Sequence, residues 1–349
     1  TDITKADILF MIDLSGSMEG EIANLKDGIN NTLIGSIKSK IPDVGFGINT
    51  FEDFDSFPAD YGTRVIQTIT TNETTLKNTM SGVNALVGTG WEPQMSAIYF
   101  SVTGEARGTT PAMNCSTSEG SIGGACFRPG AMPIFIMMTD EAFETAYSKY
   151  KVGASDWIYV STNNAIDALN GINGKFIGVD SWNSGSSGAS PANDLKAVSN
   201  GTGSVDGAGD PFYYLINSNG TGLSTNIANA VEALATSVPM LVNTGRESIT
   251  NPQSVDVTQF IKAVTPVKRV VGGNTVNCPT ECTSVAFENV KPGTTVTFDI
   301  DFYNDIFNPT TPEPTAFQAK IHVYGEGSLV DTREVYIIVP GKIGTGPGS

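Results

Sequence analysis

The chain of 349 residues has little of several residue types on which common functions depend. Histidine occurs once, as His322, and cysteine four times. Lys and Arg together number 20 against 36 Asp and Glu, so the formal net charge is −16. Because non-specific binding to nucleic acid or to anionic membranes needs clustered Lys and Arg, this balance argues against both. It fits a soluble protein or one that handles cations.

Long apolar runs and familiar catalytic motifs are also missing. No apolar run approaches the roughly 20 residues of a membrane-spanning helix, so we expect no direct insertion of this chain into a membrane. No G-x-x-x-x-G-K-[ST] motif is present, which argues against an ATPase. A Ser-His-Asp triad needs a histidine near the serine, yet His322 falls in a strand of a second domain, where we expect a paired structural role. No enzymatic activity is therefore predicted.

The four cysteines fall into two close pairs, Cys115 with Cys126 and Cys278 with Cys282. An even number in local pairs predicts two short-loop disulfides and an oxidising compartment. The alternative is a four-ligand zinc site, but the single histidine and the lack of a C-x-x-C motif argue against it. Together with abundant Gly, Ser, Thr and Asn, the disulfides predict an extracellular or cell-surface protein. Four reduced thiols would instead indicate an intracellular one.

The first two thirds of the sequence alternate strand and helix signals. Short apolar runs predict strands at 6–13, 44–51, 64–70, 132–140, 175–181 and 212–217. Apolar residues at helical spacing predict helices at 19–41, 73–83, 91 onward, 157–171, 193–201 and 224–238. Near-continuous apolar strands that alternate with helices are typical of a doubly wound, mostly parallel sheet with helices on both faces. We therefore predict an α/β domain over residues 1–242.

Residues 243–349 have a different pattern, because helical periodicity fades from position 245 onward. Gly, Pro and Asn turns separate expected strands at 257–264, 269–276, 283–290, 294–304, 316–327 and 334–341. Short strands at this spacing are typical of a small β-sandwich. We expect this second domain to support the first, as a hybrid or stalk module would.

The first predicted strand leads into the pattern D-x-S-x-S, which is Asp13, Ser15 and Ser17. Alone, this cluster could cap the following helix, since Ser and Asp are favoured caps. Thr89, just before another predicted helix, adds a hydroxyl, and Asp140, at the end of a second apolar strand, adds a carboxylate. Ligand sites in parallel sheets lie beyond the carboxyl ends of the strands. Because hard oxygen donors suit Mg²⁺, these five side chains predict a Mg²⁺ site.

This combination resembles the von Willebrand factor A, or integrin I-like, domain. The metal-ion-dependent adhesion site of that family has the form D-x-S-x-S … T … D, and all five positions are present here in the right order over residues 5–240. The resemblance implies a bound Mg²⁺, or Mn²⁺ or Ca²⁺, with one coordination position open to an Asp or Glu carboxylate of a protein or surface partner. Hydroxyls and waters do not neutralise a divalent cation, so an incoming carboxylate gains strongly. A surface adhesin of the bacterial kind is implied.

Further acidic residues could supply additional ligands. Integrin β-subunit I-like domains have a Glu near the metal and calcium ligands beside it, so the resemblance offers Glu92, Glu19 and Glu21 and a second Ca²⁺. For Glu92 the alternative is charge complementarity with the start of a helix, which we favour. The acidic segment at 52–55 could also hold a second cation, but such runs are more often solvated.

Other classes of function remain open for a domain of this kind. It could be a scaffolding or accessory subunit, associated with a pilus tip or an ion channel, or an intracellular partner of a chelatase or ATPase. Disulfides and the absence of an ATPase motif favour the surface adhesin over the intracellular forms. A purely structural, degenerate domain is a third possibility, against which the complete set of five ligands argues.

Overall fold

The structure is a computed structural model. It describes residues 3–52, 62–86, 92–105, 112, 113, 115, 121–143, 149–152, 156–183, 189–278 and 282–342. The chain divides into two compact units, Thr4–Val238 and a second that runs from Pro239 to the C-terminus and includes the first three residues. From the sequence we expected the division after residue 242, but strand β9 (Met240–Ser248) belongs to the second unit.

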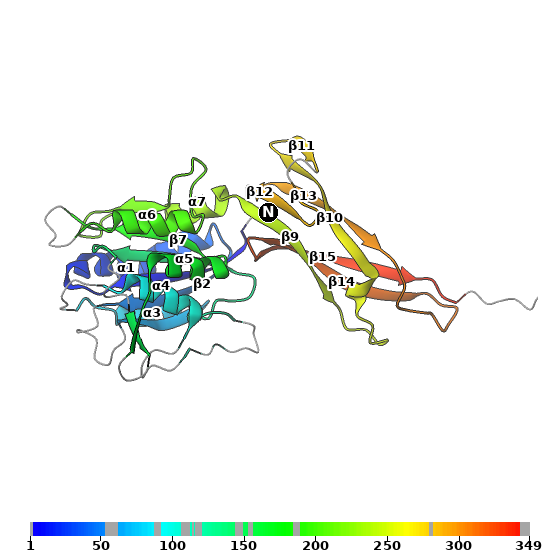
Figure 1. The fold of residues 1–349 in the computed structure, drawn as a ribbon, viewed down its shortest axis with the longest axis horizontal. Coiled ribbons are helices and arrows are strands. Elements are labelled where there is room, and N and C mark those ends of the chain that lie inside the picture. The colour runs from blue at the N-terminus through cyan, green and yellow to red at the C-terminus, as the bar shows by residue number, and fades with distance from the viewer. Residues whose placement is uncertain are drawn as a thin grey trace, which may run out of the picture. The chain divides into compact units, whose positions relative to one another are not determined.

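The first unit contains a six-stranded sheet in the order β3-β2-β1-β4-β7-β8. Figure 1 shows strands β2 and β7 of this sheet among the helices of the unit. Its strands are β1 (Lys5–Asp13), β2 (Asp43–Phe51), β3 (Thr63–Thr70), β4 (Met132–Thr139), β7 (Lys175–Asp180) and β8 (Tyr213–Leu215). All neighbouring pairs are parallel except β2 and β3, which are antiparallel. The predicted doubly wound, mostly parallel α/β fold is therefore confirmed.

The two most apolar runs of the sequence form the central strands β1 and β4. Every residue of β4 is buried, as is β1 from Ala6 to Asp13. A central parallel strand is covered on both faces, so its sequence is continuously apolar rather than alternating. That is why these two strands could be predicted with the correct bounds to within a residue.

Helices cover the sheet on both faces. They are η1 (Gly16–Met18), α1 (Glu19–Asn31), α2 (Leu33–Lys38), α3 (Glu73–Ser81), α4 (Gln94–Thr103), α5 (Thr162–Gly171), α6 (Ala192–Gly201) and α7 (Leu223–Ser237). α4, α5 and α6 contact one another in turn and pack in the same apolar core as Leu9 and Met11 of β1. α1, α2 and α7 form another contacting group. Side chains alternate along β1, and Ile8 and Phe10 are also fully buried, so the other face is covered too.

The predicted helix at 19–41 is two helices. α1 ends at Asn31 and α2 begins at Leu33. The residue between them, Thr32, departs from helical geometry with φ −133°. The break comes after two asparagines and at a β-branched threonine, which are weak helix formers.

The predicted helix at 157–171 begins later than expected. Ser161 caps α5 through a capping box with Asn164, so the helix starts at Thr162. The preceding residues form strand β6 (Asp156–Tyr159), which pairs with β5 (Lys149–Val152). The run Trp-Ile-Tyr-Val is rich in aromatic and β-branched residues, which favour strands.

The second unit is all-β, as predicted, with two antiparallel sheets ordered β12-β9-β14-β15 and β11-β10-β13. Its further elements are η3 (Val257–Phe260), β10 (Ile261–Val271), β11 (Asn274–Asn277), β12 (Ala286–Val290), β13 (Thr295–Phe302), β14 (Thr315–Gly325) and β15 (Ser328–Val339). The expected strand at 269–276 is a hairpin, because Gly272 and Gly273 turn the chain with positive φ. β9 was not predicted as a strand.

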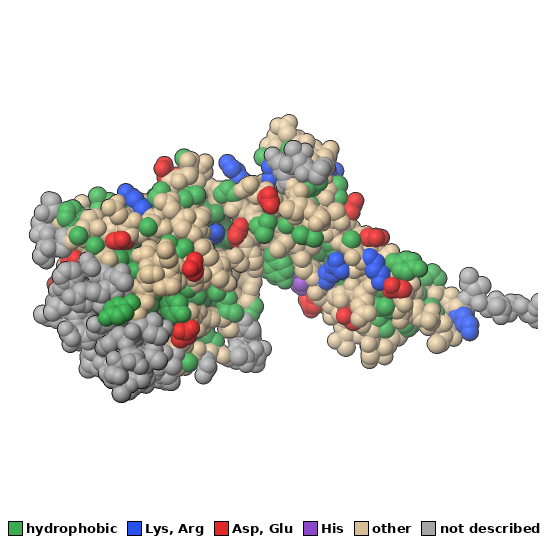
Figure 2. All heavy atoms as spheres, viewed as in Figure 1, with side chains coloured by type: hydrophobic (Ala, Val, Ile, Leu, Met, Phe, Trp, Pro, Cys, Tyr) green, Lys and Arg blue, Asp and Glu red, His purple; other side chains and the backbone are tan. Residues whose placement is uncertain are grey.

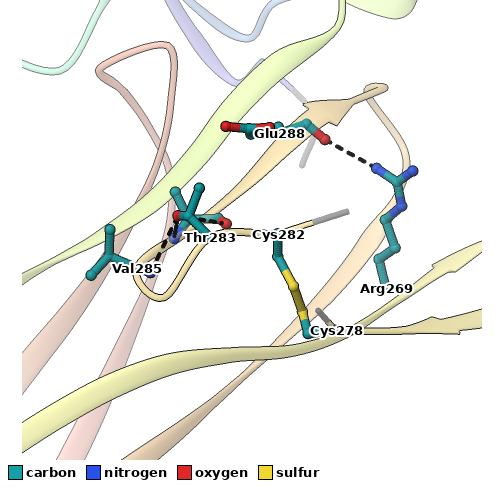
Figure 3. The surroundings of a disulfide bond; sticks show 7 residues. Arg269, Cys278, Cys282, Thr283, Val285 and Glu288 are labelled. Atoms are coloured by element: carbon teal, nitrogen blue, oxygen red, sulfur yellow. Dashed lines mark hydrogen bonds between the residues drawn. A yellow bond between two sulfur atoms is a disulfide. The ribbon is translucent and has the colours of Figure 1, made fainter. Parts of the chain in front are cut away.

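Both disulfides expected from the cysteine pairs are present. Cys115 is bonded to Cys126 in the first unit, and Cys278 to Cys282 in the second. Cys278 follows β11, and Cys282 precedes the turn at Thr283 that leads into β12 (Figure 3). Beside this bond a guanidinium nitrogen of Arg269 on β10 donates to the carbonyl oxygen of Glu288, 3.2 Å away, and so ties β12 to the other sheet.

His322 on β14 has the paired structural role that the sequence predicted. Its Nε2 lies 2.8 Å from a carboxylate oxygen of Glu247, and its Nδ1 lies 3.0 Å from the hydroxyl of Thr332. These partners are on the neighbouring strands β9 and β15. The imidazole therefore bridges three strands of one sheet.

The surface agrees with the charge balance of the sequence. Acidic side chains are scattered over the visible face rather than gathered in one patch (Figure 2). Among the described residues, no helix is both long and apolar enough to cross a membrane.

Candidate metal centre

The carboxyl ends of three parallel strands meet at one edge of the sheet in the first unit. β1 ends at Asp13, β4 at Thr139 and β7 at Asp180. β4 lies between the other two, and the register pairs Thr139 with Asp180. Because parallel sheets hold their ligands beyond this edge, its polar side chains are the first candidates for a site.

The D-x-S-x-S segment leaves β1 through a tight loop into η1. The buried carboxylate of Asp13 accepts a hydrogen bond at Oδ1 from the backbone N–H of Ser15, 2.8 Å away. Ser15 precedes η1, yet no side-chain capping bond is formed at the start of η1 or of α1. Instead the hydroxyl oxygens of Ser15 and Ser17 lie 3.1 Å apart. The helix-cap interpretation of these serines therefore finds no support, and their hydroxyls face each other.

Asp140 joins this loop from the neighbouring strand. The hydroxyl of Ser17 donates to Oδ1 of Asp140 over 3.1 Å. The hydroxyl of Thr139 donates to Oδ2 of Asp13 over 2.6 Å. The structure thus brings together the predicted ligands Asp13, Ser15, Ser17 and Asp140. The fifth, Thr89, lies outside the described residues.

Two further carboxylates lie against Asp13. Asp13, Glu52 and Glu92 are fully buried, and one carboxylate oxygen of each lies within 4.8 Å of the others. Glu52 directly follows β2, whose last residue is the sheet partner of Asp13. We expected the acidic segment at 52–55 to be solvated, and for Glu52 this prediction is wrong, because its side chain is buried. Positions 53 and 55 lie outside the described residues. Glu92 does precede α4, as the favoured helix-terminus interpretation requires. Its carboxylate also lies beside Asp13, so Glu92 belongs to this acidic group as well.

Burial and neighbouring negative charge raise the pKa values of Asp13, Asp140 and Glu141 and so disfavour their ionised forms. Burial raises the pKa of Asp13 to about 7, and the charge of Asp140 adds to the rise. Burial also raises the pKa of Asp140, with a contribution from Asp180. The pKa of Glu141 rises to about 7 through burial and then the charge of Asp140. Such a cluster is stabilised when a cation lies among the carboxylates.

Glu19 and Glu21 differ in their surroundings. Glu19 at the start of α1 is exposed, whereas Glu21 is only 1% exposed. Burial raises the pKa of Glu21 to about 7, and the charge of Asp140 contributes to this rise. Glu21 is therefore a buried carboxylate that responds to the charge of Asp140, whereas Glu19 lies at the surface.

The donor set fits a hard divalent cation. All of the side chains that meet here offer carboxylate or hydroxyl oxygen, which suits Mg²⁺, Mn²⁺ or Ca²⁺. The candidate centre can be divided into two halves that differ in charge. The serine side has the hydroxyls of Ser15 and Ser17 and the carboxylate of Asp140, and the glutamate side has the carboxylates of Glu52 and Glu92. Asp13 belongs to both halves, so it could serve two neighbouring ions.

Sequence reasoning missed Thr139, Asp180 and Ser181. Thr139 was overlooked because it makes its contribution through Asp13, as a hydrogen-bond donor. The run KFIGVDS carried a usable signal, since it is an apolar strand that ends in Asp180 and Ser181 at the same edge. Asp180 accepts hydrogen bonds from the backbone N–H of Trp182 and from the hydroxyl of Tyr213, at 2.8 and 2.7 Å.

No family model and no curated protein matches the chain. Among solved structures, the von Willebrand factor type A protein from Catenulispora acidiphila is similar at 11% identity and TM-score 0.41, covering 95% of this chain and 66% of that one. Proximal thread matrix protein 1 from the mussel byssus is similar at 16% identity and TM-score 0.42, covering 67% and 49%. The pilus adhesin SpaC from Lactobacillus rhamnosus GG is similar at 12% identity and TM-score 0.44, covering 99% and 43%.

This chain thus spans less than two thirds of the length of those structures. Scores at this level do not establish membership of a family. The strand order establishes the fold instead. The first unit is doubly wound, as its resemblance to von Willebrand factor A domains implies.

Proposed function

We propose that this chain is a surface adhesin whose first unit holds a divalent cation and uses it to bind a carboxylate of a partner. The observation that carries the proposal is the meeting of the Ser15 and Ser17 hydroxyls with Asp140 beside buried Asp13. When bound, the cation supplies the positive charge that attracts the partner's carboxylate.

The chain's own residues hold the donor oxygens in place before any ligand arrives. Each oxygen of Asp13 accepts one hydrogen bond, from the Ser15 backbone and the Thr139 hydroxyl. The carboxylate is therefore fixed in orientation rather than free to rotate. A preorganised donor costs less to order on binding, which favours affinity.

The unequal charge of the two halves suggests different roles for them. A cation on the side of Glu52 and Glu92 would face three carboxylates with Asp13 and have little attraction left for a partner. A cation on the serine side would be less neutralised and would keep its attraction for an incoming carboxylate. We therefore assign partner binding to the serine side and a supporting second ion to the glutamate side.

Binding rather than catalysis is the proposed activity. The chain's one histidine belongs to the second unit, where both of its ring nitrogens have partners, Glu247 and Thr332. Two disulfides support an extracellular or cell-surface location, where oxidised cysteines persist.

The proposal is tested by binding to candidate surfaces and immobilised proteins with Mg²⁺ or with EDTA. Wild type should bind only with the cation, and Asp13→Ala and Ser17→Ala should reduce binding to the EDTA level. The matched control is Asp167→Ala, since Asp167 is an exposed carboxylate on α5. Binding that survives EDTA and is unchanged in Asp13→Ala would overturn the proposal.

A further inference from the structure

A cavity of about 620 Å³ opens beyond the carboxyl end of β7, between the segment after β7 and the loop that joins β8 to α7. None of the described side chains that line it is charged. Most are amides or hydroxyls, among them Asn217, Ser218 and Asn226, and the apolar part is contributed by Trp182, Leu215 and Ile216. Its volume lies within the range of roughly 300–1,000 Å³ that small-molecule sites occupy.

Strand β7 connects this cavity directly to the carboxyl edge. Asp180 ends β7 beside Thr139, and it accepts a hydrogen bond from the backbone N–H of Trp182, which lines the cavity. The same carboxylate accepts a bond from the Tyr213 hydroxyl, so the start of this segment is held from two sides. The position of Trp182 relative to the cation ligands is thus set by hydrogen bonds.

The far wall of the cavity is fixed to α1, the helix that follows the Asp13–Ser17 loop and η1. The side-chain amide of Asn24 on α1 donates to the carbonyl oxygen of Asn219 over 2.7 Å. Gly220 adopts a left-handed backbone with φ 74°, and a Cβ there would lie 2.9 Å from Cα of Glu21. The loop can approach α1 this closely because position 220 has no side chain. The cavity and the metal centre therefore share the same supporting helix.

We propose that this cavity binds the ring of a saccharide whose carboxylate binds the cation, so that the ligand class is an acidic sugar. The inference rests on the proposed function for its carboxylate part. Amide side chains both donate and accept hydrogen bonds and match the alternating needs of sugar hydroxyls. Trp182 offers an aromatic surface with a polar edge, which suits the apolar face of a pyranose ring. An uncharged wall suits hydroxyl groups better than a second ionic group.

Several exposed polar side chains at the cavity are available to a ligand. The side chains of Asn217 and Ser218 are exposed, and neither makes a hydrogen bond to another described residue. Their loop is nevertheless ordered by backbone bonds, since the N–H of Gly220 donates to the carbonyl of Asn217 over 2.8 Å. Polar groups held on a fixed backbone lose little entropy on binding.

The test is titration calorimetry of wild type and variants in Mg²⁺ with three probes. The probes are an oligosaccharide ending in N-acetylneuraminic acid or glucuronic acid, the matching neutral oligosaccharide, and acetate. The acidic oligosaccharide should bind at least about ten-fold more tightly than acetate or the neutral form. Trp182→Ala and Asn217→Ala should each remove about ten-fold or more of that affinity, and Trp182→Phe should restore part of it. The control Asn78→Ala, at an exposed asparagine on α3, should change nothing.

The outcomes separate this inference from the proposed function. Mn²⁺ affinity should be unaltered in Trp182→Ala, which shows that the variant is folded and its metal centre intact. Equal affinity for acetate and the acidic oligosaccharide, or wild-type saccharide binding in both cavity variants, would overturn the saccharide inference and leave the cation proposal standing. If acidic peptides bind and lose as much affinity in Trp182→Ala as the acidic oligosaccharide does, the saccharide inference is overturned in favour of a protein ligand. Absence of Mn²⁺ binding in wild type would overturn the proposed function itself.

Discussion

At the residue scale, the metal centre depends on how the two oxygens of Asp13 are held. One accepts from the backbone of Ser15 in its own loop, and the other accepts from Thr139 on the adjacent strand. The second of these bonds joins segments 126 residues apart in the sequence. Only one of the two hydrogen bonds that orient the Asp13 carboxylate therefore comes from the local sequence.

We predict that Thr139→Val weakens metal binding. The substitution keeps the shape of the side chain but removes the hydroxyl that orients Asp13. Loss of a group that orients a ligand typically lowers metal affinity about 10–100-fold. The measurement is Mn²⁺ titration calorimetry, with Thr225→Val on the exposed face of α7 as the control. Unaltered affinity in Thr139→Val would show that the hydroxyl does not position the ligand.

Residue types and their order were enough to predict which side chains meet at this edge of the sheet. Asp13, Ser15, Ser17 and Asp140 were recognisable because a carboxylate and hydroxyls follow apolar strands at a known spacing. The burial of Glu52 was not predictable in this way. Its immediate neighbours are Phe51 on one side and Asp53 on the other, so the local pattern does not decide between burial and exposure. The packing of the sheet edge excludes water from the Glu52 carboxylate.

At the element scale, parallel strands and glycine-containing turns place these residues. β1 and β4 were predictable because central strands are continuously apolar. The end of α1 and the start of α5 were not predictable from the apolar periodicity, which continues past both points. The β-branched Thr32 follows the end of α1, and a capping box at Ser161 sets the start of α5. β9 was missed because its sequence, MLVNTGRES, is half polar and lacks a clean alternation; pairing with β12 and β14 makes it a strand.

The turn at Gly220 offers a test of how loops support the site. Gly220→Ala should destabilise the first unit by roughly 1–2 kcal/mol from the left-handed backbone alone, and the contact with α1 should add to this. Urea unfolding measures the change. Gly207→Ala is the matched control, because a Cβ there meets nothing within 4 Å. An equal effect of the two substitutions would contradict the close packing of this loop on α1.

Away from the metal centre, Arg128 joins the amino ends of β1 and β2. Its guanidinium contacts Asp7 at 2.7 Å and Asp43 at 2.6 Å, and its backbone N–H donates to Asp7 at 2.6 Å. Asp7 is fully buried, and burial raises its pKa even though Arg128 acts in the opposite direction. Arg128→Met should therefore leave a buried carboxylate without its counter-ion and cost about 3–5 kcal/mol.

The sign of the pH dependence follows from the direction of this shift. Folding raises the pKa of the Asp7 carboxyl group, so ionising this group lowers the free energy of unfolding. This loss of stability is absent at pH values below the pKa of the unfolded chain, near 4, and is complete above the pKa of the folded protein. Arg128→Met raises the folded pKa of Asp7 further, so its penalty should be larger at pH 8 than at pH 5. Arg333→Met, which removes an exposed partner of Asp331, should cost less than about 1 kcal/mol at either pH. Equal penalties for the two variants would contradict the account of Asp7.

At the scale of the whole molecule, an acidic α/β unit with a candidate cation site is followed by an all-β unit. Each disulfide lies within one unit, and so does each apolar core. The change of pattern near residue 245 was enough to separate the two from the sequence. The division falls earlier, after Val238, because the first strand of the second unit was not recognised.

The measurement that tests the central claim most directly is anomalous diffraction from crystals of the protein soaked in Mn²⁺. The account predicts a strong anomalous peak bounded by the side-chain oxygens of Asp13, Ser15 and Ser17, and its loss in crystals of Asp13→Ala. No peak at this edge of the sheet, or a peak that persists in Asp13→Ala, would contradict the cation-dependent function proposed for this chain.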